Sequence, residues 1–225
     1  MLGNLYIIAT PIGNLEDITF RAVKTLQELD FVFAEDTRTT GNLFKKYDIQ
    51  TRLFSYNAIN QKQKNSEIIR FLEEGKNVGL VSDAGTPGIS DPGYSAVSSV
   101  RNYFENKVKV ITIPGPSALT AFVSILGVGT HAWTFYGFLP HKNGRQKLLK
   151  EMVENENSSI FYESTHRIIK CIQEIEKFES NRKIAIGKEL TKIYEEVVIG
   201  TPKEILEIFT KDPSKTKGEF VVMIV

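Results

Sequence analysis

The chain has few of the residues that mark a secreted, membrane-bound or metal-binding protein. Its 225 residues include one cysteine, Cys171, which excludes an internal disulfide bond. No apolar stretch has the length of a membrane span or follows a basic leader, so we expect a cytoplasmic protein with no membrane partner. The three histidines lie on different predicted elements, away from the cysteine, and no metal site is expected.

Excess charge of one sign is also lacking, but the charges are unevenly distributed. Lys and Arg number 28 and Asp and Glu 27, for a formal net charge of +1. Residues 141–150 nevertheless hold four basic residues and no acid, namely Lys142, Arg145, Lys147 and Lys150. This segment is either a basic patch that contacts nucleic acid or an ordinary solvated face.

Glycine and proline are concentrated in three loops, at residues 9–14, 81–93 and 113–118. Each loop follows a short apolar run that reads as a β-strand, and its residue types supply positive φ, fixed φ and self-capping side chains. A single loop of this kind is more often a plain turn. Three of them at strand ends would line the carboxyl edge of an open α/β sheet, where such folds bind ligands. The pattern predicts a small-molecule cleft.

Apolar periodicity predicts an α/β protein of two domains. Strands alternate with helical patterns in the first half, which indicates parallel βαβ units, whereas several strand candidates of the second half follow one another without a helix. We therefore expect a parallel-rich sheet in residues 1–115 and a mixed sheet in residues 116–225. The predicted strands are 5–9, 31–34, 53–55, 78–81, 108–113, 134–136, 160–162, 183–186, 195–199 and 220–225.

Charged residues follow three of these strands directly. Asp83 either caps its own turn or receives a ligand amine or hydroxyl. Residues 35–38 (Glu-Asp-Thr-Arg) are either a helix cap or functional groups. In residues 163–167, Ser164 or Thr165 is expected to cap a helix, with Glu163 and Arg167 paired on the surface. From this strand-end geometry alone, a proton-accepting role would fall first to Asp36 and then to Glu163.

Several long, ordered stretches identify a family. They are residues 6–19, 34–38, 81–93, 114–118, 136–140, 161–167, 188–192 and 217–219. With these stretches the chain resembles, over nearly its whole length, the bacterial 16S ribosomal RNA (cytidine-2′-O)-methyltransferases of the tetrapyrrole-methylase superfamily. Relatives that methylate tetrapyrroles carry a G-x-G-P-G-D type of first loop, where this chain has residues 10–14 (Thr-Pro-Ile-Gly-Asn).

The resemblance implies a homodimer that binds S-adenosylmethionine in a cleft between two α/β domains. It further implies that the acceptor is a cytidine ribose in the decoding centre of 16S rRNA. The residues carried over as methyl-donor contacts are Pro11, Asp83, Ala84, Gly85, Thr86, Ser117 and Ala118, with Tyr162, Ala185, Gly218 and Glu219 around the adenosine. The expected phosphate contacts are Arg38, Lys142, Arg145, Lys147, Lys150, Arg167 and Lys188.

Two alternatives remain open from the sequence. One is a methyltransferase of the same fold that acts on a tetrapyrrole or a modified protein side chain, and the other is a non-catalytic module that binds ribosomes. The chain also departs from the family at residues 57–61, which read Asn-Ala-Ile-Asn-Gln where relatives carry a His-x-His-Asn-Glu-like segment. We expect this segment to shape the acceptor pocket and not to transfer protons.

Overall fold

The computed structural model describes residues 1–128, 132–178 and 182–225. They form two compact units, Met1–Ser117 and Ala118–Val225. The sequence placed the domain boundary after residue 115, two residues before the division between these units. None of the described helices is long and apolar enough to cross a membrane.

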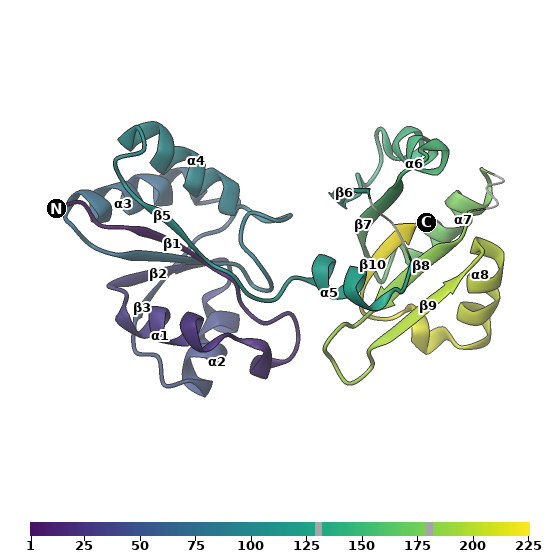
Figure 1. Ribbon diagram of the computed structural model, residues 1–225, viewed down its shortest axis with the longest axis horizontal. Coiled ribbons are helices and arrows are strands. Elements are labelled where there is room, and N and C mark those ends of the chain that lie inside the picture. Colours follow the sequence, from purple (N-terminus) through teal and green to yellow (C-terminus); the bar gives the residue numbers. More distant parts are fainter. Residues whose placement is uncertain (129–131, 179–181) are drawn as a thin grey trace. The chain divides into compact units, whose positions relative to one another are not determined.

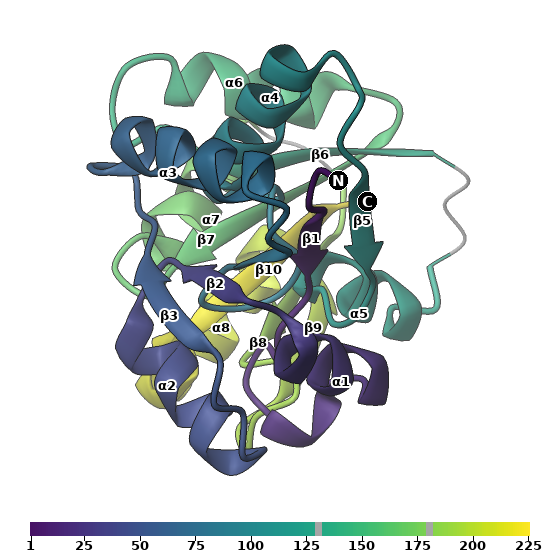
Figure 2. The same ribbon diagram turned by 90° about the vertical axis from the view of Figure 1, so that its left-hand side faces the viewer.

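The first unit is built on a five-stranded sheet in the order β3-β2-β4-β1-β5, in which all neighbouring strands are parallel. The sheet can be followed through β3, β2, β1 and β5 in Figure 2. Its strands are β1 (Leu5–Ile8), β2 (Phe31–Ala34), β3 (Arg52–Ser55), β4 (Val78–Val81) and β5 (Val110–Ile113). The parallel sheet predicted for this half is confirmed.

Four helices cover the two faces of this sheet, as Figure 1 shows. They are α1 (Phe20–Glu28), α2 (Thr37–Lys46), α3 (Gln61–Glu73) and α4 (Gly93–Phe104), with a short 3-10 turn at Leu15–Asp17. One buried cluster joins α1 and α2 to Ile8, Val32 and Val81. Another joins α3 and α4 to Leu5 and Leu80 on the opposite face. Successive residues of β1 and β4 thus pack into two separate cores, as expected of strands buried on both sides.

The connections of this sheet reverse direction between β1 and β4, which are neighbours. The chain leaves β1 through α1 on one face and leaves β4 through α4 on the other. The carboxyl ends of two such strands form a topological switch point, the position at which open α/β sheets bind ligands. Two of the three Gly/Pro loops begin at these two strand ends.

The second unit contains a mixed sheet in the order β6-β7-β10-β8-β9. Strands β6 and β7 are parallel, whereas β10 pairs antiparallel with both β7 and β8, and β9 pairs antiparallel with β8. The bounds are α5 (Ala118–Ile125), β6 (Trp133–Phe138), α6 (Arg145–Glu154), β7 (Ser158–Ser164), α7 (Ile168–Glu176), β8 (Ile184–Lys188), β9 (Glu196–Gly200), α8 (Pro202–Lys211), a 3-10 turn at Pro213–Thr216 and β10 (Glu219–Ile224). The mixed sheet is also confirmed.

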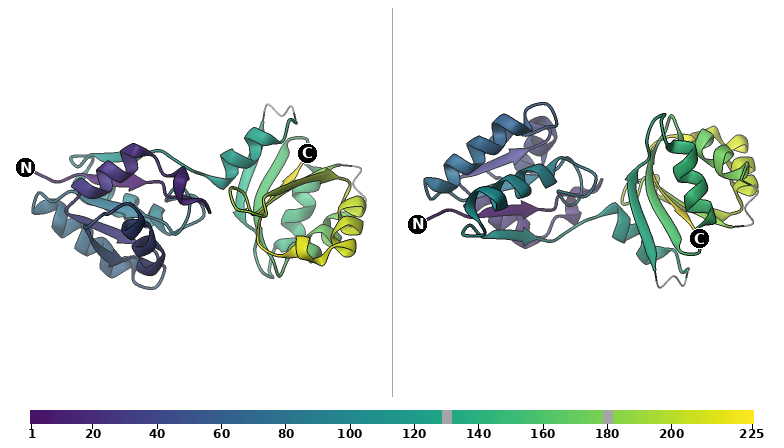
Figure 3. Two further views of the ribbon diagram at one scale, coloured as in Figure 1. Left: turned by 90° about the horizontal axis from the view of Figure 1, so that it is seen from below. Right: turned by 90° about the horizontal axis from the view of Figure 1, so that it is seen from above.

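Helices α6, α7 and α8 pack on one face of this second sheet, around Phe161, Ile186 and Val222 (Figure 3). Two of them, α6 and α8, were not predicted. A signal for α8 is present in the sequence, because Thr201 and Glu204 form a capping box and Pro202 occupies the first helical turn. The expectation that several strands of this half follow one another without a helix holds for β8 and β9.

Candidate methyl-donor site

The first and second Gly/Pro loops are bonded to each other at the switch point. The backbone N–H of Thr10 donates to the carbonyl oxygen of Gly85 at 2.9 Å, and the N–H of Gly85 donates to the carbonyl oxygen of Thr10 at 3.0 Å. The Thr10 hydroxyl donates to the carbonyl oxygen of Ser82 at 3.1 Å. Pro11 is buried directly after this bridge. The loops that follow β1 and β4 therefore act as one connected element.

The third loop joins the same edge through Thr86. The Thr86 hydroxyl donates to the carbonyl oxygen of Pro116 at 3.2 Å, and the neighbouring Ser117 is buried. The N–H of Ala9 donates to the carbonyl oxygen of Ile113 at 3.1 Å, which ties the end of β1 to the end of β5. All three loops thus meet at one edge of the sheet, which confirms the geometric expectation.

The loop at residues 81–93 is held rigid by its own side chains. One carboxylate oxygen of Asp91 accepts from the N–H groups of Gly88 and Gly93, both at 2.7 Å. The Ser82 hydroxyl lies 3.3 Å from the carbonyl oxygen of Ala84 and 3.4 Å from that of Gly85. Gly85 has φ +81°, a backbone conformation that β-branched residues rarely adopt. The loop is preorganised, which reduces the entropy lost when a ligand binds.

The loop that follows β2 is joined to the loop at residues 81–93 by a hydrogen bond. The backbone N–H of Asp36 donates to the Asp83 carboxylate at 2.8 Å. Asp83 was predicted to receive a ligand group, and one of its oxygens is already engaged in this contact. The Glu35 carboxyl group lies close to Asp83, whose charge raises its pKa and whose backbone N–H lowers it. The Glu35 side chain therefore lies beside the predicted donor loop.

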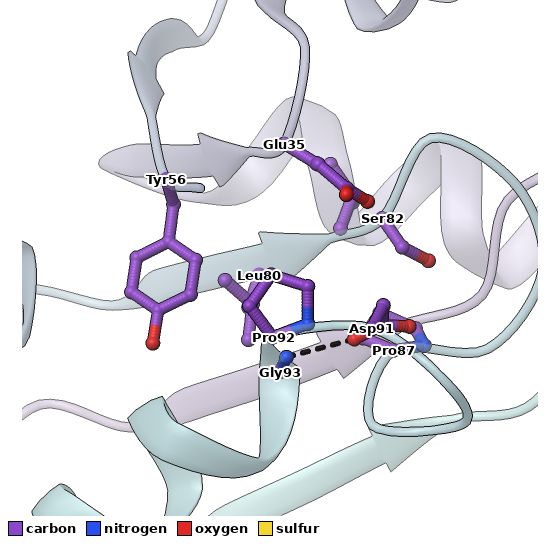
Figure 4. A pocket seen from close by; sticks show the side chains of 9 residues that line it. Glu35, Tyr56, Leu80, Ser82, Pro87, Asp91, Pro92 and Gly93 are labelled. Carbon is purple, nitrogen blue, oxygen red and sulfur yellow. Dashed lines mark hydrogen bonds between the residues drawn. The ribbon is translucent and has the colours of Figure 1, made fainter. Parts of the chain in front are cut away.

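Glu35 lines a small pocket below this loop, in which its side chain extends toward Ser82 (Figure 4). Asp91 and Tyr56 lie on the other sides of the pocket, and apolar side chains from the end of β4 and from Pro87 and Pro92 complete it. Burial, followed by the charges of Asp83 and Asp91, raises the pKa of Glu35. Three carboxyl groups therefore lie near one another at this sheet edge.

Asp36 has the opposite environment to its neighbour Glu35. Its carboxylate accepts from the Arg38 guanidinium at 2.7 Å and from the Arg38 backbone N–H at 2.8 Å, at the N-terminus of α2. These hydrogen bonds lower the pKa of Asp36 to about 2. A carboxylate of such low basicity is a poor proton acceptor near neutral pH. The structure therefore favours the helix-cap interpretation of Asp36 over the predicted role as a base.

The site residues expected from the second half lie on one face and one edge of the mixed sheet. Tyr162 on β7 and Ala185 on β8 both alternate with residues that pack on the helices, so they face the opposite side of the sheet. The Tyr162 ring makes edge and tilted contacts with Phe135 and Phe138. The sheet thus brings Tyr162 and Ala185 to a common face that includes aromatic side chains.

Gly218 and Glu219 are fixed at the start of β10. The Thr165 hydroxyl donates to the carbonyl oxygen of Gly218 at 2.6 Å and accepts from its N–H at 2.8 Å. Lys192 bridges Glu219 at 2.8 Å and Glu189 at 2.9 Å. Thr165 was expected to cap α7, but it orders the β10 loop instead, and α7 begins after Arg167 without a side-chain cap.

A buried ionic network occupies the strand end at Glu163. The Glu163 side chain has no exposed surface and contacts the guanidinium of Arg167 at 2.7 Å and that of Arg145 at 2.9 Å. Arg145 also contacts Glu174 at 2.9 Å. Arg167 further donates to the carbonyl oxygen of Leu139 at 3.0 Å. The Glu163 carboxylate is engaged by two guanidinium groups and has no surface that a substrate could reach. Its pair with Arg167 is thus buried where the sequence predicted a surface pair.

The network also changes the predicted set of phosphate contacts. The Arg145 side chain is 5% exposed and the Arg167 side chain is 17% exposed, and both are engaged by Glu163. Lys188 is buried, and its ammonium donates to the carbonyl oxygen of Ser214 at 3.1 Å. Arg145 and Lys188 therefore do not occupy the surface positions that phosphate contacts require. The predicted cations that are exposed are Arg38, Lys142, Lys147 and Lys150.

Residues 57–61, where the chain departs from its family, form a turn that leads into α3. The Asn57 side chain accepts from the N–H groups of Ile59 and Asn60, both at 3.1 Å. The Asn60 side chain accepts from the N–H of Asn57 at 2.8 Å. The side-chain amides of Asn57 and Asn60 also donate to Ser55 at the end of β3, which ties the turn to the sheet. The Ile59 side chain is exposed.

The described residues contain no cluster of three or more His, Cys, Asp or Glu that could hold a metal ion. His131 lies outside them. Cys171 is buried within the α7 face of the core, and burial raises its pKa to about 12. The thiol is therefore protonated and inert near neutral pH.

Comparison with known proteins defines the class and then the family. The family described as Tetrapyrrole (Corrin/Porphyrin) Methylases matches residues 4–206. The uroporphyrin-III C-methyltransferase of Thermus thermophilus, solved with S-adenosyl homocysteine, has a TM-score of 0.67 at 16% identity and covers 98% of this chain and 97% of its own. A diphthine synthase has a TM-score of 0.73 at 11% identity and covers 98% of this chain and 88% of its own. These structures establish the tetrapyrrole-methylase fold.

Sequence relatives of higher identity narrow the assignment. The ribosomal RNA small subunit methyltransferase I of Thermotoga maritima is 42% identical and covers 99% of this chain and 98% of its own length. The protein of the same name from Escherichia coli O157:H7 is 41% identical, and the match covers 99% of this chain and 77% of that protein. The chain therefore belongs to the ribosomal RNA small subunit methyltransferase I family of the tetrapyrrole methylases. The fold class and family predicted from the sequence are both confirmed.

Proposed function

We propose that this protein transfers a methyl group from S-adenosylmethionine to the ribose 2′-oxygen of a cytidine in the decoding centre of 16S rRNA. The observation that carries the proposal is the 42% identity over 99% of the chain to a ribosomal RNA small subunit methyltransferase I. Membership in this family makes the protein an S-adenosylmethionine-dependent methyltransferase that acts on small-subunit rRNA. The nucleotide, the ribose position and the decoding centre come from the resemblance found in the sequence.

The switch-point loops fit the chemistry of this donor. S-adenosylmethionine carries a sulfonium and an ammonium cation, and Asp83 and Asp91 place two carboxylates on the loop that is connected to Thr10. Asp83 and Ala84 are exposed beside the buried Gly85, and the Thr86 hydroxyl and Ser117 lie at the same edge. We assign the donor contacts to Pro11, Asp83, Ala84, Gly85, Thr86, Ser117 and Ala118, with Tyr162, Ala185, Gly218 and Glu219 around the adenosine.

The residues contribute mainly by positioning. The bound donor supplies an electrophilic methyl group, and the ribose oxygen must approach it in line with the breaking bond. The bridge between Thr10 and Gly85 and the tie from Thr86 to Pro116 hold the donor loops in one arrangement before a ligand arrives. Such preorganisation lowers the entropic part of the barrier for a reaction between two bound molecules.

The substrate RNA and the oligomeric state complete the proposal. We assign phosphate contacts to the exposed Arg38, Lys142, Lys147 and Lys150, since phosphate contacts position an RNA without reading its sequence. The protein acts as a homodimer in the cytoplasm, where small subunits are assembled. Light scattering coupled to size-exclusion chromatography tests the dimer.

The decisive experiment uses small ribosomal subunits from cells that lack this methylation. The protein is incubated with these subunits and donor labelled in the methyl group, and ribose methylation of the 16S rRNA is mapped by nuclease resistance and mass spectrometry. The proposal predicts one labelled 2′-O-methylcytidine in the decoding centre. Deproteinised 16S rRNA and mature, methylated subunits are the control substrates.

Other results would support one of the alternatives. Label on a tetrapyrrole or on a ribosomal protein side chain, with none on RNA, would overturn the proposed acceptor. Binding of subunits without measurable affinity for S-adenosylmethionine in calorimetry would indicate a non-catalytic module. Label on a different nucleotide or on a base would keep the enzyme class and correct the target.

A further inference from the structure

Methyl transfer to a hydroxyl leaves a proton to be removed, and the sequence candidates for its acceptor have unsuitable environments. Asp36 is held by Arg38, and Glu163 is buried between two guanidinium groups. Another carboxyl group, Glu35, lies at the same sheet edge as the donor loops. It follows β2 directly, and none of the salt bridges within the described residues includes it.

We propose that Glu35 is the catalytic residue that accepts the proton from the ribose 2′-hydroxyl. This inference rests on the proposed function, and it names a residue in the site where that reaction would occur. Glu35 lines the pocket at the ends of β2 and β4, and its carboxyl group lies close to Asp83, the first residue of the predicted donor segment 83–86.

The proton and electron balance of the step is simple. The oxygen–hydrogen bond of the ribose breaks as its electron pair forms the new oxygen–carbon bond, and the proton passes to a carboxylate oxygen of Glu35. The bond between the methyl carbon and sulfur breaks with its electron pair remaining on sulfur, so the donor product is a neutral thioether. Glu35 then releases the proton to solvent, and no further reactant is needed.

The groups around Glu35 raise its pKa and so increase its basicity. Asp83 and Asp91 both face it, and Tyr56 is the other titratable group of the pocket. Burial and these two negative charges raise the pKa of Glu35, which makes its carboxylate a stronger base than an ordinary glutamate. The ionised carboxylate is the form that accepts a proton. A neighbouring Asp36 with a pKa of about 2 lacks this basicity.

The contact with Asp83 also offers a purely structural explanation, in which Glu35 only ties two loops together. Glu35→Gln separates the two roles, because a glutamine oxygen can accept from the Asp83 N–H but cannot act as a base. We expect methyl transfer to small subunits to fall by roughly 10²-fold. Donor affinity in calorimetry and the midpoint of thermal unfolding should stay near the wild-type values. Glu35→Ala removes both roles and should reduce donor affinity as well.

Two further measurements make the test independent of one variant. In the wild-type rate profile, activity should rise with pH through the raised pKa of Glu35, and this acidic limb should be absent in Glu35→Gln. Carboxyl-carbon NMR titration, with Glu35 assigned by difference from Glu35→Gln, should place its pKa above 4.5 in the free protein. Asp36→Asn, which retains a helix-capping side chain, tests the competing assignment.

Several results would overturn the assignment. They are a Glu35→Gln rate near that of the wild type, a tenfold or greater loss of donor affinity in Glu35→Gln, and a Glu35 pKa at or below 4.5. A large loss of rate in Asp36→Asn with Glu35→Gln unaffected would restore Asp36 as the base. If the wild-type protein methylated no small subunit, the proposed function would fail, a result distinct from all of these because the titration and donor binding are measured without RNA.

Discussion

Two strand-end segments of this protein have similar sequences and opposite environments. Residues 35–38 follow β2, residues 163–167 follow β7, and each begins with Glu and ends with Arg. In the first, the Arg38 side chain is 89% exposed and pairs with Asp36 at the surface. In the second, the Glu163 side chain has no exposed surface and contacts two guanidinium groups. Similar local sequences therefore form an exposed ion pair in one unit and a buried ionic network in the other.

The difference shows that a partner from a distant element determines whether a carboxylate at a strand end is buried in an ion pair or remains accessible. Glu163 is buried because Arg145, from the start of α6, reaches it across 18 residues of sequence, and Glu174 of α7 holds the same guanidinium. Among the described residues no cation forms a salt bridge with Glu35, which lies beside the donor loops near Asp83 and Asp91. Buried charges with partners serve structure, whereas a half-buried carboxylate without a cation remains available for chemistry.

The largest expected effect is on stability, and it comes from the buried network. Glu163→Gln removes the charge that Arg145 and Arg167 share, and it leaves buried guanidinium charge less well compensated. We expect the free energy of unfolding to fall by about 3 kcal/mol, as is typical when one partner of a buried ion pair is lost. Urea denaturation followed by circular dichroism measures the change.

Asp36→Asn is the matched variant for the exposed segment. Its pair with Arg38 lies in solvent, and asparagine still caps α2, so the unfolding midpoint should change little. Equal destabilisation by the two substitutions would remove the contrast between the segments.

The second prediction concerns donor binding at the solvated edge. Gly85→Val forces a β-branched side chain into φ +81°, and it also covers backbone that the donor is proposed to contact. Affinity for S-adenosylmethionine, measured by calorimetry, should fall by at least about tenfold while the protein stays folded. Gly144→Val is the control, because Gly144 has φ +80° and no neighbour within 4 Å of an added Cβ, and it lies at the start of α6. If both variants bound the donor as the wild type does, the loop would not belong to the site.

The third prediction separates exposed from buried cations in the basic segment. Replacing Lys142 and Lys147 with Gln should weaken binding to small subunits and reduce the slope of log affinity against log salt by roughly 1.5, since each phosphate contact releases about 0.7 to 0.9 counterions. Replacement of Lys203 and Lys211 on α8, which are exposed as well, should leave the slope unchanged. A slope that falls equally in both variants would mean that the basic segment acts only through net charge.

Most of the first unit was predictable from the sequence because its signals are local. Short apolar runs that end at polar residues located β2 and β4 to the residue. The meeting of the three loops also followed, since parallel strands bring their carboxyl ends to one edge. The burial of Arg145 could not be predicted, because it depends on α6 packing beside β7 and α7. In residues 141–150 alone, a core guanidinium has the same sequence signature as a surface one.

The choice between candidate bases depends on distant contacts for a related reason. The sequence offered Glu35 and Asp36 as adjacent carboxylates, and strand-end position does not distinguish them. The structure does, because Asp36 starts α2 and receives Arg38, whereas Glu35 points into the pocket under the loop at residues 81–93. Alternation along an extended chain sends neighbouring side chains in opposite directions, so a shift of one residue changes the chemistry completely.

The smallest expected effect is at residues 57–61, where the chain departs from its family. The turn there is closed by the side chains of Asn57 and Asn60, and the proposed proton acceptor Glu35 lies on another loop. We therefore combine Asn57→His, Ile59→His and Gln61→Glu, which puts the family's side chains back, and expect the methylation rate to change by less than about threefold. General acid–base groups contribute ~10² to 10⁴-fold, so this limit distinguishes a shaping role from a catalytic one. The dependence of the wild-type methylation rate on pH should show no titration of an imidazole near pH ~6.5, and the triple variant should not acquire one. A rate increase of orders of magnitude together with such a titration would mean that the segment transfers protons in the family, and that this chain works without its principal catalytic groups.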